Sequence, residues 1–459
     1  MTHMFDPSIL RAYDIRGIFG DTLHLNDAYV LGRVFATYLN KPGATVVVGR
    51  DGRLSSPALA EKLIQGLIEG GLDVKNVGLG PTPMIYFAQK YLNADAALMV
   101  SGSHNPGNYN GFKMTLATGP FFGQDIQFLN TLAAQGGWVQ GPGKYSDVDI
   151  SSPYMTHLID DFHQHYPSHP HMRIAWDPGH GAACDVLKSL VKRLPGDHIL
   201  INDVVDGHFP HHHPDPSIEA NLEQLKEVVL TQKCDFGLAF DGDGDRIGAI
   251  DARGRVIWGD MLTALFAEEI LSSHPGASII MDIKSSQVFM NYISHLGGIP
   301  KLYRTGHSYI KAYMKENKSP LAGELSGHMF FADRYYGFDD ALYAALRFIG
   351  RFASTQETPA QWLDRLPETF ISPEITFQST SADKFNIVEA ISRRLTTEKA
   401  DFIAIDGVRV NREQGWWLVR ASNTQDILVA RLESASAQGL EKLREDMSIY
   451  LRPFGIEVS

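Results

Sequence analysis

A strand-and-loop pattern that occurs three times along the chain is the feature that most constrains its fold. Apolar segments that run directly into short loops lie at residues 45–52, 173–181 and 278–284. After each of them a second apolar segment ends in a polar loop, at residues 101–106, 241–246 and 320–328. The stretches between them, such as residues 57–68 and 222–230, have apolar residues at the three- and four-residue spacing of helices. Strand–helix–strand alternation predicts three α/β domains, each of which projects a loop toward a common place.

The C-terminal part has a different pattern. Residues 402–410, 415–420 and 427–433 have the composition of strands, and residues 439–447 that of a closing helix. We therefore predict an α/β fold class, with three tandem mixed α/β domains and a C-terminal α+β domain around one central cleft. The predicted domains span residues 1–149, 150–252, 253–365 and 366–459, the last beginning at Leu366-Pro367.

The acidic loop Asp241-Gly-Asp-Gly-Asp-Arg246 follows an apolar strand. If the loop is extended, its alternate residues point the same way, and Asp241, Asp243 and Asp245 converge on one hard cation such as Mg²⁺. An EF-hand calcium loop requires Gly at position six and Glu at position twelve, but these positions are Arg246 and Ala252. A solvated acidic loop remains the alternative.

A second polar loop, Ser101-Gly-Ser-His-Asn-Pro106, also follows an apolar strand. Ser103 is its candidate nucleophile and His104 a neighbouring imidazole. The nucleophile elbow of hydrolases, G-x-S-x-G, is not matched, because Asn105 occupies the position of the second glycine. A polar turn around Asn105-Pro106 is the structural alternative.

Composition narrows the function. The 459 residues have a net charge of −12, which disfavours nucleic acid as a partner. No apolar run approaches the length of a membrane span, and the N-terminal residues lack the pattern of a secretory signal. We expect a cytoplasmic protein without nucleic-acid or membrane partners, with Cys184 and Cys234 reduced in the core. The histidines of residues 209–216, bounded by prolines, favour a turn with solvent-facing imidazoles over a zinc site.

Taken together, the motifs resemble the α-D-phosphohexomutase family, in particular its bacterial phosphomannomutase/phosphoglucomutase branch. The resemblance covers essentially the whole chain in order. Residues 101–106 resemble the family's phosphoserine loop, residues 241–246 its metal loop, residues 323–328 its sugar-binding loop and residues 420–424 its C-terminal phosphate-binding loop. It implies a heart-shaped molecule of four domains.

The resemblance implies a mutase that interconverts the 1- and 6-phosphates of mannose or glucose through a phosphoserine and a hexose 1,6-bisphosphate. It implies a monomer with a phosphosugar substrate, one Mg²⁺ per chain and hexose 1,6-bisphosphate as activator. The implied metal ligands are Ser103, Asp241, Asp243 and Asp245, and the implied catalytic residues are Ser103, His104, Lys113, Arg246 and Arg16. Lys113 or a nearby histidine would transfer the proton of the sugar hydroxyl, and as a base Lys113 would need a lowered pKa.

The implied substrate-binding residues divide into two groups. Glu324 and Ser326 would bind the sugar's O3 and O4, with Tyr13, Lys284, His307 and His328 nearby. The non-transferring phosphate would be bound by Arg420, Ser422, Asn423 and Thr424.

Three departures from the family pattern bear on substrate choice: Leu325 in place of Met, His180 in place of Asn, and Gln425-Asp426 after Thr424. A phosphoglucosamine mutase is therefore an alternative within the family, and a Mg²⁺-dependent sugar phosphatase is an alternative of another class. A P-loop kinase has no support, since G-x-x-x-x-G-K-[ST] is absent.

Overall fold

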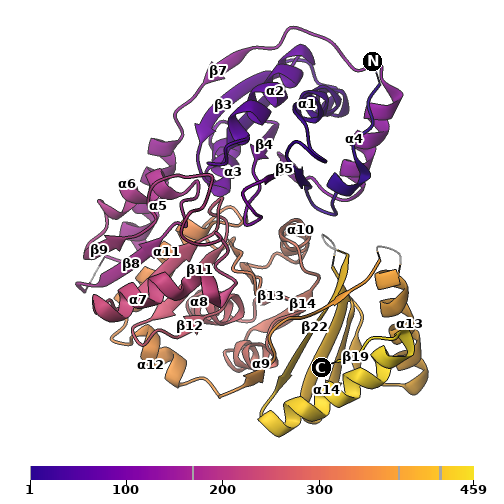
Figure 1. The fold of residues 1–459 in the computed structure, drawn as a ribbon. Helices are drawn as coiled ribbons and strands as arrows, with labels where there is room; N and C mark the ends of the chain where they lie inside the picture. The colour runs from indigo at the N-terminus through magenta and orange to yellow at the C-terminus, as the bar shows by residue number, and fades with distance from the viewer. Residues whose placement is uncertain (1, 168–169, 381–382, 423–425, 459) are drawn as a thin grey trace.

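The computed structural model describes residues 2–167, 170–380, 383–422 and 426–458 (Figure 1). Its first sheet has the strand order β1-β5-β4-β2-β3-β7, with β6 beside β5. The strands are β1 (Ile15–Ile18), β2 (Thr45–Arg50), β3 (Asp73–Leu79), β4 (Ala96–Val100), β5 (Tyr109–Leu116), β6 (Gly119–Pro120) and β7 (Tyr145–Asp147). The helices of this part are α1 (Leu25–Leu39), α2 (Ser56–Glu69), α3 (Thr82–Tyr91) and α4 (Gln124–Gln135), after a 3₁₀ turn, η1 (Pro7–Ile9).

The second sheet has the order β12-β11-β10-β8-β9. Its strands are β8 (Arg173–Asp177), β9 (Asp197–Leu200), β10 (Phe236–Phe240), β11 (Ile247–Asp251) and β12 (Val256–Ile257). The helices are α5 (Ser151–His165), α6 (Cys184–Val191), η2 (Glu219–Leu222) and α7 (Glu223–Thr231).

The third sheet has the order β14-β13-β15-β16. Its strands are β13 (Ser278–Asp282), β14 (Ile299–Tyr303), β15 (Leu321–Gly323) and β16 (Met329–Phe331). The helices are α8 (Gly259–Ser273), α9 (Gln287–His295), α10 (His307–Asn317), α11 (Ala341–Ala353) and α12 (Pro359–Asp364).

The repeat predicted from the sequence is confirmed by the strand pairing. Strands β2, β8 and β13 each lie between two parallel neighbours. In every case the chain then leaves the last parallel strand, β4, β10 or β15, through a polar loop and returns antiparallel in β5, β11 or β16. The three polar loops are thus at equivalent positions of three similar sheets.

The fourth sheet is antiparallel, with the order β17-β22-β21-β20-β19 and β18 beside β22. Its strands are β17 (Phe370–Ile371), β18 (Ile375–Gln378), β19 (Phe402–Ile403), β20 (Val408–Arg412), β21 (Gly415–Ala421) and β22 (Ile427–Ser434). The helices are α13 (Asp383–Glu398), α14 (Ala437–Leu451) and η3 (Arg452–Phe454). The single strand expected at residues 402–410 is wrong: a turn with Gly407 at φ 86° divides it into the antiparallel pair β19 and β20.

One large apolar cluster runs through the first three sheets. It includes Phe87 on α3, Tyr154 on α5, Trp176 on β8 and Tyr343 on α11. A separate cluster lies between the fourth sheet and helices α13 and α14, which Figure 1 shows in orange to yellow at one end of the molecule. The first three sheets therefore form one packed body. The C-terminal domain has its own core, and Trp416 and Leu418 on β21 also join it to the large cluster.

Both cysteines are buried and free, as expected for reduced core residues. Among the described residues, no helix combines the length and the apolar composition that crossing a membrane requires.

Arg409 on β20 joins the C-terminal domain to the third sheet. Its buried guanidinium donates to the carbonyls of Ile283 (2.8 Å) and Ser285 (2.6 Å) and stacks on Trp416, 3.8 Å from the ring centre. We expect Arg409→Ala to lower the free energy of unfolding by about 2–4 kcal/mol, because it leaves two buried carbonyls unpaired.

Chemical denaturation measures this change. The control is Arg393→Ala on the exposed face of α13, whose ion pair with Glu389 is solvent-exposed and should contribute less than about 1 kcal/mol. Equal effects of the two substitutions would contradict a docking role for Arg409.

Candidate active site

Ser103 lies in the loop after β4 and is 2% exposed. Its backbone has a φ of 49°, a left-handed conformation that is uncommon for residues other than glycine. Its Oγ donates to Asp241 Oδ2 at 2.8 Å and is 3.2 Å from His104 Nδ1. The two polar loops therefore meet at one hydroxyl, although 138 residues separate Ser103 from Asp241.

Arg53 holds the serine loop in this conformation. Its buried guanidinium donates to the carbonyls of Ser103 (2.7 Å), Asn105 (2.5 Å), Pro106 (2.5 Å) and Tyr109 (3.0 Å). Sequence reasoning missed this residue. Its position could have indicated it, because Arg53 directly follows residues 45–52, the first strand-and-loop segment of the repeat.

Arg16 on β1 contacts the same loop from the other side. It donates to Gly102 O at 3.1 Å and to Asn105 Oδ1 at 2.6 Å, and it pairs with Asp14 at 2.5 Å. Since β1 pairs with β5, Arg16 and Lys113 lie on neighbouring strands at the edge where the serine loop begins.

The acidic loop is a tight turn rather than an extended segment, so the expected geometry is wrong. Gly244 has a φ of 70°, and its N–H donates to Asp241 O at 3.1 Å. The turn still brings carboxylate oxygens of Asp241, Asp243 and Asp245 within 4.8 Å of one another, all buried. Positive φ at the glycine, not alternation along a strand, makes the three side chains converge.

Lys113 balances the charge of these carboxylates. Its ammonium donates to Asp243 Oδ2 at 2.7 Å and to Asp245 Oδ2. Burial alone would lower the pKa of Lys113, but Asp243, Asp245 and Asp241 raise it well above its ordinary value. Lys113 is therefore an ammonium in this arrangement and lacks the lowered pKa that a base requires.

The pKa of Asp243 shows the same balance. Burial and the neighbouring Asp245 raise this pKa, but Lys113 and the hydroxyl of Thr82 outweigh them and lower it to about 2. Thr82 donates to Asp243 Oδ2 at 2.6 Å, and Ser101 donates to the same oxygen at 2.9 Å. The other oxygen, Oδ1, is buried without a hydrogen-bond partner among the described residues.

These residues fit a divalent cation. They present carboxylate oxygens and the hydroxyl of Ser103, the ligand type that Mg²⁺ prefers, with one buried oxygen of Asp243 free to bind it. A second group with close ligand atoms, Asp245, His328 and Asp339, is less suited, because Lys311 already neutralises Asp339 at 2.8 Å.

The loop after β15 joins the acidic loop directly. Arg246 and His328 form a β-bridge, and Arg246 Nε lies 3.4 Å from His328 Nε2. Glu324 lies 2.9 Å from His328 Nδ1, and Ser326 Oγ is 3.2 Å from the same nitrogen. Burial lowers the pKa of His328, but Asp245, 3.2 Å from its Nε2, and Glu324 raise it to about 9.

Tyr13 and His307 continue this cluster. The His307 ring stacks on His328 with centroids 5.6 Å apart, and Tyr13 contacts His307 edge-on at 5.4 Å. The N–H of Gly306 donates to Glu324 Oε1 at 2.6 Å. Glu324, Ser326, His328, His307 and Tyr13 therefore belong to one contiguous group that reaches the acidic loop through Arg246.

The remaining candidates lie apart from this group. Arg420 on β21 pairs with Asp406 at 2.9 Å, and Asp406 also accepts from the N–H of Thr305 at 3.1 Å. Lys284 pairs with Glu374 at 3.1 Å. Ser422 is buried, whereas Asn423 and Thr424 lie outside the described residues. Within the described residues, no hydrogen bond or ion pair joins Arg420 or Lys284 to Ser103.

The prediction for the histidine-rich segment is partly wrong. His211 is exposed, but its Nδ1 is 2.6 Å from His180 Nε2. His212 points inward instead, with Nε2 2.9 Å from Asp177 Oδ2. Asp177 is the last residue of β8, at the same sheet edge as the acidic loop. Its carboxylate is buried and requires a polar partner, and His212 provides one.

Comparison with known proteins places these observations in a family. Four phosphoglucomutase/phosphomannomutase domain models match the chain: the alpha/beta/alpha domains I, II and III at residues 7–132, 152–254 and 258–370, and the C-terminal domain at residues 376–449. The division predicted at residues 149/150, 252/253 and 365/366 stays a prediction.

Relatives and solved structures are similar over nearly the whole chain. The Pseudomonas aeruginosa phosphomannomutase/phosphoglucomutase is 41% identical over 95% of this chain and 94% of its own. A Neisseria gonorrhoeae phosphoglucomutase is 39% identical over 95% of both. The structure of a phosphoglucomutase/phosphomannomutase family protein from Burkholderia thailandensis has a TM-score of 0.92 at 36% identity and covers 99% of each chain.

The acidic loop should bind one Mg²⁺ per chain. We expect Asp243→Asn to weaken this binding about tenfold or more, since it removes a charged ligand. Isothermal titration with Mg²⁺ measures it, with the exposed Asp160→Asn on α5 as the control that keeps wild-type affinity. Equal affinity of Asp243→Asn and the wild type would rule out this loop as the metal site.

The raised pKa of His328 makes stability depend on pH in metal-free protein. Folding stabilises the protonated imidazole, so its contribution is fully present below pH 6.5 and is lost as pH rises through about 9. The loss is about 3 kcal/mol from the size of the shift. Urea unfolding in EDTA between pH 6.5 and 9.5 measures it.

His328→Gln should flatten this part of the profile, while His295→Gln on the exposed face of α9 should retain it. A wild-type slope in His328→Gln would show that another group titrates.

Proposed function

This chain belongs to the phosphoglucomutase/phosphomannomutase family and is a hexose phosphate mutase, and we propose that Ser103 is its phosphate carrier. In the proposed reaction, phospho-Ser103 gives its phosphoryl group to the free hydroxyl of a hexose 1- or 6-phosphate. The resulting hexose 1,6-bisphosphate turns end over end, and Ser103 Oγ takes back the other phosphoryl group. The single observation that supports this assignment most is the 2.8 Å contact between Ser103 Oγ and Asp241 of the acidic loop.

The charges around Ser103 suit phosphoryl transfer. A phosphoserine has a charge of about −1.5 to −2 at neutral pH. Mg²⁺ on Ser103, Asp241, Asp243 and Asp245 would supply positive charge to the reacting phosphate. Three carboxylates and one Mg²⁺ leave a net negative charge, so fixed cations are still needed. The buried Lys113 and Arg16 and the partly buried Arg246 would provide them.

The transferred proton requires a base that is neutral before the step. Burial, Arg246 and Arg16 lower the pKa of His104 well below its ordinary value, so its imidazole is neutral. His104 Nδ1 is 3.2 Å from Ser103 Oγ. We therefore favour His104 over Lys113 for moving the proton of Ser103 Oγ: His104 takes this proton when Oγ accepts the phosphoryl group and returns it when the group leaves, while Lys113 stabilises charge in the transition state.

Substrate choice depends on the loop after β15. Glu324 and Ser326 offer an acceptor and a donor suited to O3 and O4, which mannose and glucose share, whereas the two sugars differ at C2. Recognition through O3 and O4 accepts both epimers, so we propose activity on mannose and glucose phosphates. The named activities of the Pseudomonas and Neisseria relatives support this range.

The distal phosphate would be bound by the C-terminal domain. Arg420 is held by Asp406, so a bound phosphate would have to share or replace this ion pair. We also propose that hexose 1,6-bisphosphate activates the enzyme by loading Ser103, and that the protein acts as a cytoplasmic monomer.

Ser103→Ala tests the carrier role. We expect mutase turnover to fall about 1,000-fold or more, because no hydroxyl remains to accept phosphate, while glucose 1-phosphate still binds. A coupled assay with glucose 1-phosphate and mannose 1-phosphate, primed with hexose 1,6-bisphosphate, measures turnover.

Ser189→Ala, on α6 away from the site, is the matched control and should keep full activity. Full turnover in Ser103→Ala would remove Ser103 from the mechanism. Stoichiometric release of inorganic phosphate by the wild type would instead favour the phosphatase alternative.

A further inference from the structure

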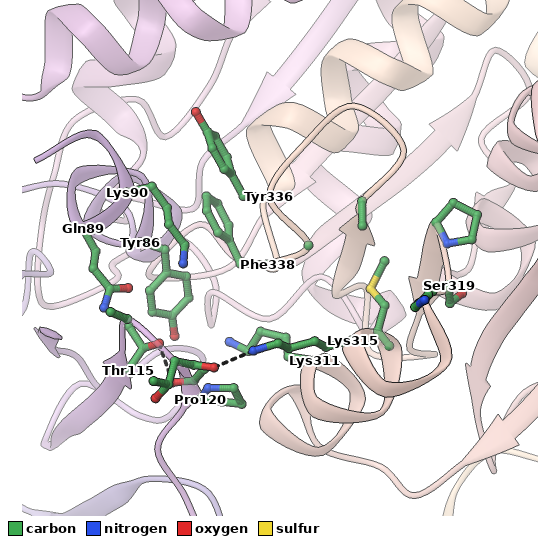
Figure 2. Close-up of a pocket in the computed structure, with 18 of the residues that line it drawn as sticks. Tyr86, Gln89, Lys90, Thr115, Pro120, Lys311, Lys315, Ser319, Tyr336 and Phe338 are labelled. Carbon is green, nitrogen blue, oxygen red and sulfur yellow. Dashed lines mark hydrogen bonds between the residues drawn. The ribbon is translucent and has the colours of Figure 1, made fainter. Parts of the chain in front are cut away.

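A cavity of about 570 Å³ lies between the first and third domains, away from Ser103. Its walls come from helix α3, the turn between β5 and β6, helix α10 and the loop after β16 (Figure 2). Lys315 on α10 bridges the two domains by donating to Thr118 O at 2.7 Å. We call this space the interdomain cavity. Its volume is in the range of sites that bind a whole small molecule.

The lining of the interdomain cavity is cationic. It contains Lys90, Lys311, Lys315 and Lys318 and no carboxylate residue. Lys311 pairs with Asp339, but in the described part of the chain no carboxylate lies within ion-pair distance of the other three. Desolvation and the positive charge of Lys315 lower the pKa of Lys90. Lys90, Lys315 and Lys318 are exposed, so their ammonium groups are available to an anionic ligand that enters the cavity.

A buried donor points to the same kind of ligand. Gln89 on α3 lines the cavity and is 3% exposed, yet its Nε2 has no hydrogen-bond partner among the described residues. A buried amide N–H without an acceptor costs free energy, and almost all such groups in folded proteins are paired. The nitrogen is covered in this conformation, so a rotation of the Gln89 side chain would present it to an oxygen-rich ligand in the cavity.

Aromatic rings form another wall. Tyr336 and Phe338 lie nearly parallel, 7° apart with centroids 5.7 Å apart, and Tyr86 packs on Phe338 at 5.6 Å. Figure 2 shows Tyr336 and Phe338 on one side of the cavity and Lys311 and Lys315 on another. Tyr336 is 44% exposed whereas Phe338 is buried, so Tyr336 is the ring of this pair that is available to stack on a planar group.

We propose that the interdomain cavity binds a nucleoside diphosphate, with the phosphates on Lys90, Lys315 and Gln89 and the base on the Tyr336–Phe338 pair. A diphosphate matches several ammonium donors better than a neutral sugar does, and the flat apolar base matches the aromatic wall. Bound there, the ligand ties α3 of the first domain to α10 of the third. This site is additional to the mutase site, and it does not depend on the proposed mechanism.

Calorimetric titration of the full-length protein with ADP and UDP tests the proposal. EDTA is present so that the acidic loop cannot hold a nucleotide through a metal. We expect one nucleotide per chain, an affinity that falls as salt rises, and binding about tenfold or more weaker in Lys90→Gln/Lys315→Gln. Lys442→Gln, on the exposed face of α14, is the matched control and should bind like the wild type.

Two further titrations distinguish binding of the whole nucleotide from binding of its phosphates alone and from binding at the mutase site. Inorganic pyrophosphate should bind about tenfold more weakly than the nucleotide, since it lacks the base. Excess glucose 6-phosphate should not displace the nucleotide. No nucleotide binding, unchanged binding in the double variant, equal affinity for pyrophosphate, or displacement by glucose 6-phosphate would each overturn the proposal. Mutase turnover of the double variant, which we expect to be unchanged, shows that the protein is folded.

Discussion

The structure around Ser103 depends on the charge balance among three buried carboxylates and one buried lysine. Asp241, Asp243 and Asp245 have no exposed surface, and in the absence of compensation their burial would be strongly unfavourable. Lys113 pairs with two of them, and Ser103 donates to the third. Because Lys113 and Ser103 come from the first sheet and the carboxylates from the second, this balance also fixes how the two sheets meet. A bound Mg²⁺ would change this charge balance, so we expect it to influence the packing of the first sheet against the second as well as the reaction at Ser103.

Three sheets of the same topology explain how loops so distant in sequence meet. In each sheet the polar loop follows the last parallel strand, where side chains collect at the carboxyl edge. The β-bridge between Arg246 and His328 then joins the second sheet's loop to the third's, as the Ser103–Asp241 contact joins the first to the second. The C-terminal domain, with its own core, contacts the third domain at Arg409, at Asp406 and through the Lys284–Glu374 pair.

Much of this could be predicted from the sequence, because it depends on local pattern. The apolar strands before Ser103 and Asp241, and their repetition, indicate three similar sheets. What the sequence does not reveal depends on strand register and distant partners. Lys113 reaches Asp243 across 130 residues, and the four carbonyls on Arg53 belong to a loop about 50 residues away. The inward turn of His212 likewise depends on Asp177, whose burial no local pattern indicates.

The central claim is that Ser103 passes its phosphoryl group to the sugar. The most direct measurement loads the enzyme with radiolabelled phosphate from hexose 1,6-bisphosphate, isolates it, and mixes it with unlabelled glucose 6-phosphate in a rapid-quench experiment. We predict that the label leaves Ser103 and appears in hexose bisphosphate at a rate no slower than turnover. Label that remains on the protein during turnover, or that appears directly as inorganic phosphate, would contradict the account.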